Sequence, residues 1–433
     1  MPMRRSRLLQ FSVFIVWLAA ACSVWAQQTP GYELKVLTDR PDALYHANDP
    51  VTFDMTLLRE NQPVAQGQVE YIISNDGEET LDQGSLPVTG ESLAVTGRLD
   101  KPGFLRCQAT YTGEDGKKYL STAGAGVDPL DIRPSLPVPD DFDAFWSEKK
   151  KELAAVPMNP VLTPVDSSSA DIECFDLQLD CLGGAPVSGY YMRPKAAQPK
   201  SLPALLSVHG AGVRSSNKPA RYAELGMLAL DINAHGIPNG KPAEFYQGLA
   251  KGELANYRHQ GRESRETYYF LGMYLRLIRA MEFLMAQPQW DGKELIVIGS
   301  SQGGGQSLVA AGLNPRVTAL AANVPAMCEH TGRVNGWPRL VPRDEQGNPD
   351  PQILEAARYF DAMNFAARTQ ADAVVTVGFI DNTCRPTSVY AAYNNLRGPK
   401  RIVNEPLMKH ESRPSFTQAA DELIRKHIQK AKP

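Results

Sequence analysis

Short segments of alternating apolar and polar residues fill the chain between residues 32 and 127. Turn-forming runs such as Asn75-Asp76-Gly77 and Glu114-Asp115-Gly116 separate them. This alternation is typical of β-strands with one buried face and predicts strands at 32–37, 51–57, 69–73, 93–96 and 104–111. Without a helical repeat, these strands predict an all-β, immunoglobulin-like sandwich domain over residues 28–131. No motif in this region carries evident chemistry, so it is interpreted as a structural module, with carbohydrate binding as the alternative.

The pattern changes after residue 131. A proline-rich stretch, 132–139, predicts a stiff linker, and a helix with an apolar stripe follows it, with Asp140 or Asp141 as its cap. Apolar runs then alternate with helical patterns, and the strands are predicted at 204–209, 227–232, 295–299, 373–380 and 401–404. This alternation predicts an α/β domain over residues 132–433, with a mostly parallel, doubly wound sheet. Functional groups of such a sheet lie at the carboxyl ends of its strands.

Composition narrows the possible partners. The chain has 433 residues, a formal net charge of −3 and no long basic run, so nucleic acid is not an expected partner. The sequence contains neither a phosphate-binding G-x-x-x-x-G-K-[ST] loop nor a paired C-x-x-C or H-E-x-x-H metal motif. We therefore expect no metal ion and no organic cofactor.

The first residues of the chain resemble an export signal. Three arginines precede the apolar run 8–21, and Val24-Trp25-Ala26 offers small residues for cleavage after residue 26. We expect residues 1–26 to be a signal peptide and the protein to be periplasmic or secreted. A lipoprotein signal with the lipid on Cys22 and a retained membrane anchor are the alternatives. The run is shorter than the about 20 residues that span a bilayer, and no later segment is apolar enough, so the mature chain is expected to have no membrane span.

The most informative motif is Gly299-Ser300-Ser301-Gln302-Gly303. It follows the apolar run 295–298 and precedes a helix-compatible run, 306–312. A strand, a serine between glycines and a helix form the nucleophile elbow of an α/β-hydrolase. The turn is too tight for side chains at the flanking positions, which glycine satisfies. The motif predicts Ser301 as the nucleophile.

A serine hydroxyl needs a base to take its proton and an acid to orient that base, in the chain order serine, acid, histidine. Three histidines follow Ser301. His427 belongs to a predicted solvated terminal helix, and His330 precedes the predicted acid strand. His410 follows the last predicted strand and is therefore the expected base. Asp381 directly follows strand 373–380 and is the expected acid; a turn or cap role is the alternative.

Two backbone N–H groups should stabilise the oxyanion that forms during acyl transfer. We expect one from Gln302, directly after the nucleophile. The other is expected from Ala211, in the segment Val208-His209-Gly210-Ala211-Gly212, which ends a predicted apolar strand and begins the loop after it. His209 is interpreted as a brace for this loop rather than as a proton carrier.

Several separated motifs give the second domain a family resemblance. They are Pro139-Asp140-Asp141-Phe142-Asp143-Ala144-Phe145-Trp146, Thr267-Tyr268-Tyr269, Gly299 to Gly305, Val324-Pro325-Ala326-Met327-Cys328, Tyr359 to Ala366, Asp381 with Cys384 to Asn394, and His410-Glu411. The domain resembles the acetyl xylan esterases and cephalosporin C deacetylases of carbohydrate esterase family seven, from about Pro134 to the end of the chain. The resemblance implies an α/β-hydrolase fold and independently assigns Ser301, Asp381 and His410 to the catalytic triad.

The sequence departs from that family in two places. Asn233-Ala234-His235-Gly236 stands where the family has Arg-Gly-Gln, and Ala211 stands where it tends to have tyrosine. A backbone donor survives the second change. Asn233 and His235 become candidate substrate contacts, with a loop-stabilising role as the alternative for His235. The departures and the added β-domain leave open the exact substrate and the homo-oligomer that the family's ring-shaped hexamer implies.

The expected function is that of a serine esterase that removes small acyl groups from sugars or oligosaccharides, with acetyl as the expected group. Two alternatives remain. The same triad could serve a peptidase or amide hydrolase, or the chain could be a carbohydrate-binding protein with a relic site.

Overall fold

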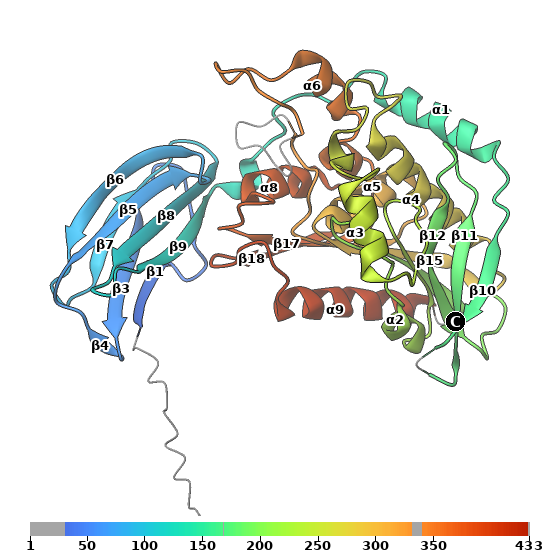
Figure 1. The fold of residues 1–433 in the computed structure, drawn as a ribbon, viewed down its shortest axis with the longest axis horizontal. Coiled ribbons are helices and arrows are strands. Elements are labelled where there is room, and N and C mark those ends of the chain that lie inside the picture. Colours follow the sequence, from blue (N-terminus) through green and yellow to red (C-terminus); the bar gives the residue numbers. More distant parts are fainter. Residues whose placement is uncertain (1–30, 168, 331–339, 432–433) are drawn as a thin grey trace, which may run out of the picture.

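The computed structural model describes residues 31–167, 169–330 and 340–431. The expected signal peptide, residues 1–26, and Cys22 lie outside these ranges. An all-β region comes first, and an α/β region built on one large sheet follows it (Figure 1). Within the described ranges, we find no helix that combines the length and the apolar character needed to cross a membrane.

The all-β region contains two sheets. One joins β1 (Tyr32–Thr38), β3 (Val51–Arg59), β4 (Gln62–Pro63) and β7 (Leu93–Gly97). The other has the order β2 (Leu44–Tyr45), β9 (Lys118–Val127), β8 (Gly103–Thr112), β5 (Gln68–Asn75) and β6 (Glu79–Pro87). Apolar side chains from both sheets, including Val36, Phe53, Ile73 and Leu105, form one core. The five predicted strands are all present.

The α/β region is built on a nine-stranded sheet with the order β10-β11-β12-β14-β13-β15-β16-β17-β18. Its strands are β10 (Val161–Val165), β11 (Ile172–Leu179), β12 (Val187–Pro194), β13 (Leu202–Val208), β14 (Leu228–Ile232), β15 (Trp290–Ser300), β16 (Ala319–Asn323), β17 (Asp372–Gly378) and β18 (Lys400–Glu405). The six strands from β13 to β18 run parallel, whereas β10, β11 and β12 pair antiparallel. The predicted mostly parallel sheet is confirmed.

Helices cover both faces of this sheet, because its strands are apolar on both sides. Leu206, Val297 and Val375 pack in the core shared with α1 (Phe142–Ala154), α4 (Tyr269–Met285), α5 (Gln302–Leu313), α7 (Ala362–Ala366) and α8 (Pro386–Asn395). Their neighbours Leu205, Ile296 and Val374 pack on the opposite face with α9 (Pro414–Ala431). Each such buried aliphatic side chain contributes about 1.5–3 kcal/mol. Three shorter helices, α2 (Ala220–Glu224), α3 (Ala243–Lys251) and α6 (Pro351–Arg358), lie in the connections.

The start of α1 differs from the prediction. Asp141 occupies the cap position, but its side chain accepts no capping hydrogen bond. The carboxylate instead accepts hydrogen bonds from Arg265, at 2.7 Å, and from the Tyr359 hydroxyl. These bonds, with that to Tyr359 as the larger cause, lower the pKa of Asp141. The aspartate therefore ties the start of the helix to the rest of the α/β region.

The two regions pack directly against each other beside β17 (Figure 1). The ring of Phe104, on β8, lies 4.9 Å from that of Phe379 and 5.5 Å from that of Tyr390, centroid to centroid. On β9, a Cβ added to Gly124 would lie 2.7 Å from the Phe379 carbonyl oxygen, so only glycine permits this approach. The all-β region is thus docked on the segment that follows β17.

Candidate active site

Ser301 lies in the sharp turn between β15 and α5 with φ 57° and ψ −119°. A non-glycine residue pays about 1–3 kcal/mol for such backbone angles. The flanking glycines explain how the turn closes. A Cβ on Gly299 would lie 2.3 Å from the Gly303 carbonyl oxygen, and one on Gly303 would lie 2.1 Å from the Val208 carbonyl oxygen. The predicted elbow therefore has the strained geometry that presents a serine hydroxyl at the end of a strand.

The structure brings the three predicted triad side chains together. His410 Nε2 lies 2.9 Å from Ser301 Oγ, and His410 Nδ1 lies 2.8 Å from Asp381 Oδ2. In the neutral imidazole tautomer that fits both contacts, the serine hydroxyl donates to Nε2 and the Nδ1–H group donates to the carboxylate. His410 comes from the loop between β18 and α9, and Asp381 from the loop after β17. The three side chains form one hydrogen-bonded chain.

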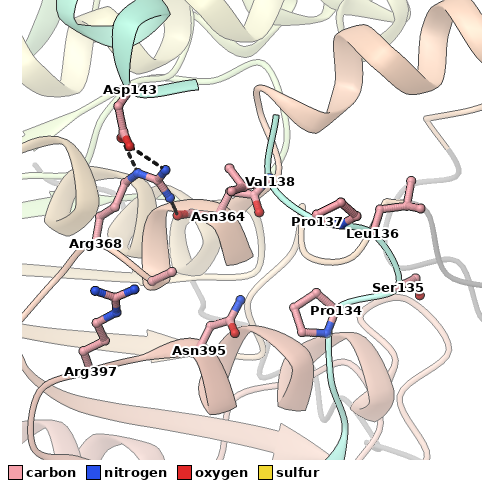
Figure 2. Close-up of a pocket in the computed structure, with 11 residues that line it drawn as sticks. Pro134, Ser135, Leu136, Pro137, Val138, Asp143, Asn364, Arg368, Asn395 and Arg397 are labelled. Carbon is pink, nitrogen blue, oxygen red and sulfur yellow. Dashed lines mark hydrogen bonds and ion pairs between the residues drawn. The ribbon is translucent and has the colours of Figure 1, made fainter. Parts of the chain in front are cut away.

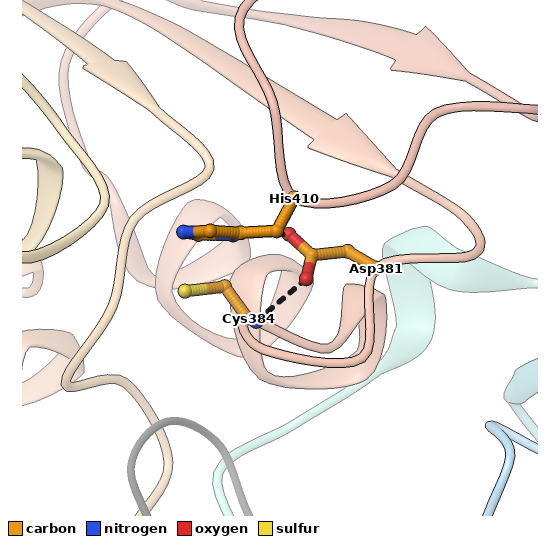
Figure 3. Close-up of side chains that lie close together, drawn as sticks. All are labelled: Asp381, Cys384 and His410. Carbon is orange, nitrogen blue, oxygen red and sulfur yellow. Dashed lines mark hydrogen bonds and ion pairs between the residues drawn. The ribbon is translucent and has the colours of Figure 1, made fainter.

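Asp381 is fully buried and held on both oxygens. While Oδ2 faces His410, Oδ1 accepts a hydrogen bond from the backbone N–H group of Cys384 at 2.9 Å (Figure 3). The same oxygen also accepts from the backbone N–H group of Thr383 at 2.7 Å. The loop is therefore folded around its own acid, which fixes the direction in which the carboxylate meets the imidazole.

Cys384 adds a thiol to this group. Single ligand atoms of Asp381, Cys384 and His410 all lie within 4.8 Å of one another, a spacing that also suits a metal ion (Figure 3). Burial, however, raises the pKa of the Cys384 thiol well above its usual value, against the smaller effect of a hydrogen bond with Ser301. His410 Nδ1 is already paired with Asp381 Oδ2, and His410 Nε2 is already paired with Ser301 Oγ. The arrangement fits a proton relay better than a metal site.

Both expected oxyanion donors lie on segments next to the serine. Gln302 is the first residue of α5, where backbone N–H groups have no partner within the helix. Its side chain is buried and accepts a hydrogen bond from the Tyr257 hydroxyl at 2.6 Å, so the side chain has a structural role. The loop that carries Ala211 passes close by, because a Cβ added to Gly210 would lie 3.6 Å from Ser301 Cβ.

His209 braces that loop, as expected. Its Nδ1 lies 2.6 Å from the Gly210 carbonyl oxygen. Burial lowers the pKa of His209 to about 4, so the ring is neutral at physiological pH and its Nδ1–H donates to the carbonyl.

Asn233 and His235, the candidate substrate contacts, are buried and engaged within the protein. Asn233 accepts from the backbone N–H groups of His235 and Ile237 and donates to the Ile237 carbonyl. Both ring nitrogens of His235 have partners, Tyr269 Oη at 2.7 Å and the Gly212 carbonyl at 3.2 Å. The polar atoms of these two side chains all have partners within the protein, an arrangement that favours a loop-stabilising role over substrate contact. Both residues stabilise loops, the alternative already considered for His235.

His427 is also placed differently from the prediction. It is buried rather than solvated, and its Nδ1 lies 2.6 Å from Glu294 Oε2. His330 is buried too, and its backbone N–H donates to Asp361. Of the three histidines after Ser301, His410 is the one whose ring contacts the serine.

Asn323, at the end of β16, is a residue of the site that the sequence analysis missed. Its carbonyl accepts from the Ser301 N–H at 2.9 Å, and its side-chain amide donates to Ser300 Oγ at 2.8 Å. A polar residue that closes the apolar run 319–322 is the signal that could have identified it.

A cavity of about 700 Å³ lies away from these residues, beside the linker (Figure 2). It is lined by residues 134–138 together with Asp143, Asn364, Arg368, Asn395 and Arg397, among others. Its most prominent polar feature is the two-pronged contact of Arg368 with Asp143. None of the triad residues lines it, so it is separate from the candidate active site.

Comparisons with known proteins agree with this geometry. The acetyl xylan esterase family (AXE1) matches residues 130–427. The chain is 30% identical over 428 residues to acetyl esterase Axe7A of Xylanibacter ruminicola, and the alignment covers 95% of each protein. The acetyl xylan esterase of Paenibacillus sp. R4 is 30% identical with a TM-score of 0.60, covering 69% of this chain and 98% of that one. Acetyl xylan esterase 1 of Thermoanaerobacterium sp. JW/SL YS485 is 25% identical with a TM-score of 0.61, covering 70% and 98%.

These findings confirm the expected fold class, an α/β-hydrolase preceded by an all-β region. The chain belongs to the acetyl xylan esterase family and is a carboxylic-ester hydrolase, of the kind that acts on acetyl esters.

Proposed function

We propose that this protein hydrolyses small acyl esters, mainly acetate esters, on sugars or oligosaccharides through an acyl-enzyme on Ser301. The observation that carries the proposal is the position of the His410 ring, which lies 2.9 Å from Ser301 Oγ and 2.8 Å from Asp381 Oδ2. Family membership supports the acetyl ester as the reacting group.

In the first half of the reaction, Ser301 Oγ attacks the ester carbonyl while its proton passes to His410 Nε2. The Asp381 carboxylate stabilises the resulting imidazolium and keeps its ring oriented. The N–H groups of Gln302 and Ala211 receive the oxyanion of the tetrahedral intermediate. When the intermediate collapses, the carbon–oxygen bond to the sugar breaks and the alcohol leaves with the proton from His410.

In the second half, a water molecule attacks the acyl-enzyme. His410 takes a proton from this water and later returns it to Ser301 Oγ, so acetate and the free enzyme are released. The exposed fraction of the His410 side chain, 28%, is consistent with access of water and substrate to the base from solvent.

The test is to compare acetylated xylo-oligosaccharides with dipeptide anilides as substrates of the full chain. We expect release of acetate from the oligosaccharides and no detectable release of the anilide. Preferential cleavage of the anilide would instead favour a peptidase with the same triad. Failure to cleave either substrate or react with a fluorophosphonate would favour a relic site in a carbohydrate-binding protein.

We further propose that residues 1–26 direct export, because three arginines precede an apolar run and a small-residue cleavage site. An oligosaccharide or polymer substrate outside the cytoplasm suits such an enzyme. After expression in a bacterium, N-terminal sequencing should show that the mature protein begins at Gln27. A lipid on Cys22 would instead establish the lipoprotein alternative.

A further inference from the structure

Arg106, on β8 of the all-β region, reaches into the loop that carries the proposed catalytic acid. Its side chain is 6% exposed. Nη2 donates to the carbonyl oxygen of Asp381 at 3.1 Å and to that of Phe379 at 3.4 Å, while Nη1 donates to Asn382 Oδ1. One guanidinium therefore holds the acid residue together with residues on both sides of it.

Asp76 places a negative charge behind this arginine. It lies in the turn between β5 and β6, is fully buried and has its Oδ1 3.7 Å from Arg106 Nη2. The same turn holds the downstream part of the acid loop. The Arg385 guanidinium donates to the Asp76 carbonyl oxygen, and Asp76 Oδ2 accepts from the Thr387 N–H at 3.3 Å. The tip of this hairpin thus contacts the chain downstream of Asp381, whereas Arg106 on β8 contacts Asp381 itself and the residues next to it.

The hairpin tip is shaped for this contact. Asp76 and Gly77 both have positive φ, 51° and 77°. A Cβ on Gly77 would lie 2.7 Å from Arg106 Nη1, so a side chain there would displace the guanidinium. Burial raises the pKa of Asp76 to about 6. The positive charge of Arg106 is the largest of the effects that lower this pKa, so the arginine favours the ionised carboxylate.

Placing a guanidinium inside a protein is strongly unfavourable unless hydrogen bonds and a counter-charge compensate for its lost hydration. The Arg106 guanidinium donates to Phe379, Asp381 and Asn382 of the acid loop, and its counter-charge is Asp76. The hydrogen bonds that the Arg106 side chain donates therefore hold the acid loop and not the sheet from which the side chain projects.

We infer that Arg106 is a positioning residue for the esterase reaction, through which the all-β region keeps the Asp381 carboxylate aligned with His410. The inference rests on the proposed function, because it assigns Asp381 as the orienting acid. Backbone amides of the loop hold one carboxylate oxygen, and Arg106 holds the same loop through the Asp381 carbonyl oxygen. Misplacement of a catalytic group by about 1 Å can cost about 10²-fold in rate.

The experiment measures kcat and KM of the full chain for 4-nitrophenyl acetate, with thermal unfolding recorded for each variant. For Arg106→Ala we expect kcat to fall about 10- to 100-fold while KM stays within about twofold. Arg106→Lys keeps one donor and the charge beside Asp76, so its kcat should be at least about threefold higher than that of Arg106→Ala. The rate constant of inactivation by a fluorophosphonate should follow kcat, since it reports serine activation without the natural substrate.

Two control variants separate positioning from docking. Phe104→Leu weakens the apolar contact with Phe379 and Tyr390 but leaves the arginine in place, so it should lower the unfolding temperature with a much smaller loss of kcat. Arg59→Ala removes a surface arginine that pairs with Glu114, and it should leave kcat and KM unchanged.

A folded Arg106→Ala enzyme with kcat within about twofold of wild type would overturn the inference. So would a Phe104→Leu enzyme that matches it in both lost stability and lost kcat. If Arg106→Ala does not fold, Arg106→Lys and Asn382→Ala test the inference instead, because each weakens the contact between Arg106 and the acid loop without leaving an empty space at Arg106. An unchanged kcat in both variants would overturn the inference. Normal turnover by Ser301→Ala would instead refute the proposed function.

Discussion

Asn323 fixes the nucleophile elbow from the neighbouring strand, because its side-chain amide donates to Ser300 Oγ at 2.8 Å. Its side-chain carbonyl accepts from the buried Thr376 hydroxyl, and its main-chain carbonyl accepts from the Ser301 N–H. Asn323, on β16, thereby connects the end of β15, which leads into Ser301, with Thr376 on β17. The strained backbone of Ser301 persists because these contacts hold it on the strand side.

Asn323→Ala should lower both stability and turnover. The substitution leaves the Thr376 hydroxyl buried without its partner, which costs about 1–3 kcal/mol, and it frees Ser300 to move. We expect a lower unfolding temperature and a kcat for 4-nitrophenyl acetate reduced about tenfold. Asn348→Ala is the matched control, since Asn348 is exposed and donates to Asp344. A variant as active and stable as wild type would show that the elbow does not depend on this contact.

Asp381→Asn should nearly abolish catalysis while preserving the fold. The asparagine oxygen can still accept from Thr383 and Cys384, but the amide nitrogen then faces His410 Nδ1 and favours the wrong imidazole tautomer. By the scale of other serine hydrolases, kcat should fall about 10³- to 10⁴-fold. Asp143→Asn, in the separate cavity, should keep kcat near the wild-type value. A loss of less than tenfold for Asp381→Asn would remove Asp381 from the proposed relay.

The buried His235 should make stability depend on pH. Burial lowers the pKa of His235 to about 3, while the unfolded side chain titrates near its ordinary value of 6.5. Between these values the unfolded chain binds a proton that the folded chain excludes. The stabilisation is therefore complete above about pH 6.5 and is lost as pH falls toward 3.

His235→Gln lacks this titration and still offers a polar side chain to the loop. Urea unfolding between pH 4.5 and 6 should give a slope of stability against pH that is smaller than in wild type by about 1 kcal/mol per pH unit. His209 contributes to the same trend in both proteins, since burial lowers its pKa to about 4. Identical slopes in the two proteins would contradict the buried, neutral state of His235.

Much of the α/β region could be predicted because its strands are buried on both faces and therefore appear as apolar runs. The position of β16 could not be predicted in this way, because its alanine-rich run, Ala319–Asn323, is equally compatible with a helix. In the all-β region, the sequence pattern does not predict β6, because nearly all residues of this strand are exposed. An alternating pattern requires one buried face, which this edge strand lacks.

The meeting of Ser301, Asp381 and His410 could be anticipated because each of them follows a strand whose carboxyl end the fold directs to the same edge. His427 was misjudged because α9 presents it to the sheet, where it meets Glu294. Arg106 had no local signal, because its partner Asp381 lies 275 positions further along the chain. Contacts of this kind depend on how two regions dock, which no periodic pattern encodes.

The most direct test of the central claim locates the nucleophile chemically. The full chain is treated with a fluorophosphonate, and the adduct is mapped by mass spectrometry of its peptides. We predict one adduct per chain, on Ser301, and none in a folded Ser301→Ala variant, which also fails to hydrolyse 4-nitrophenyl acetate. An adduct on another residue, together with retained hydrolysis by Ser301→Ala, would contradict the account.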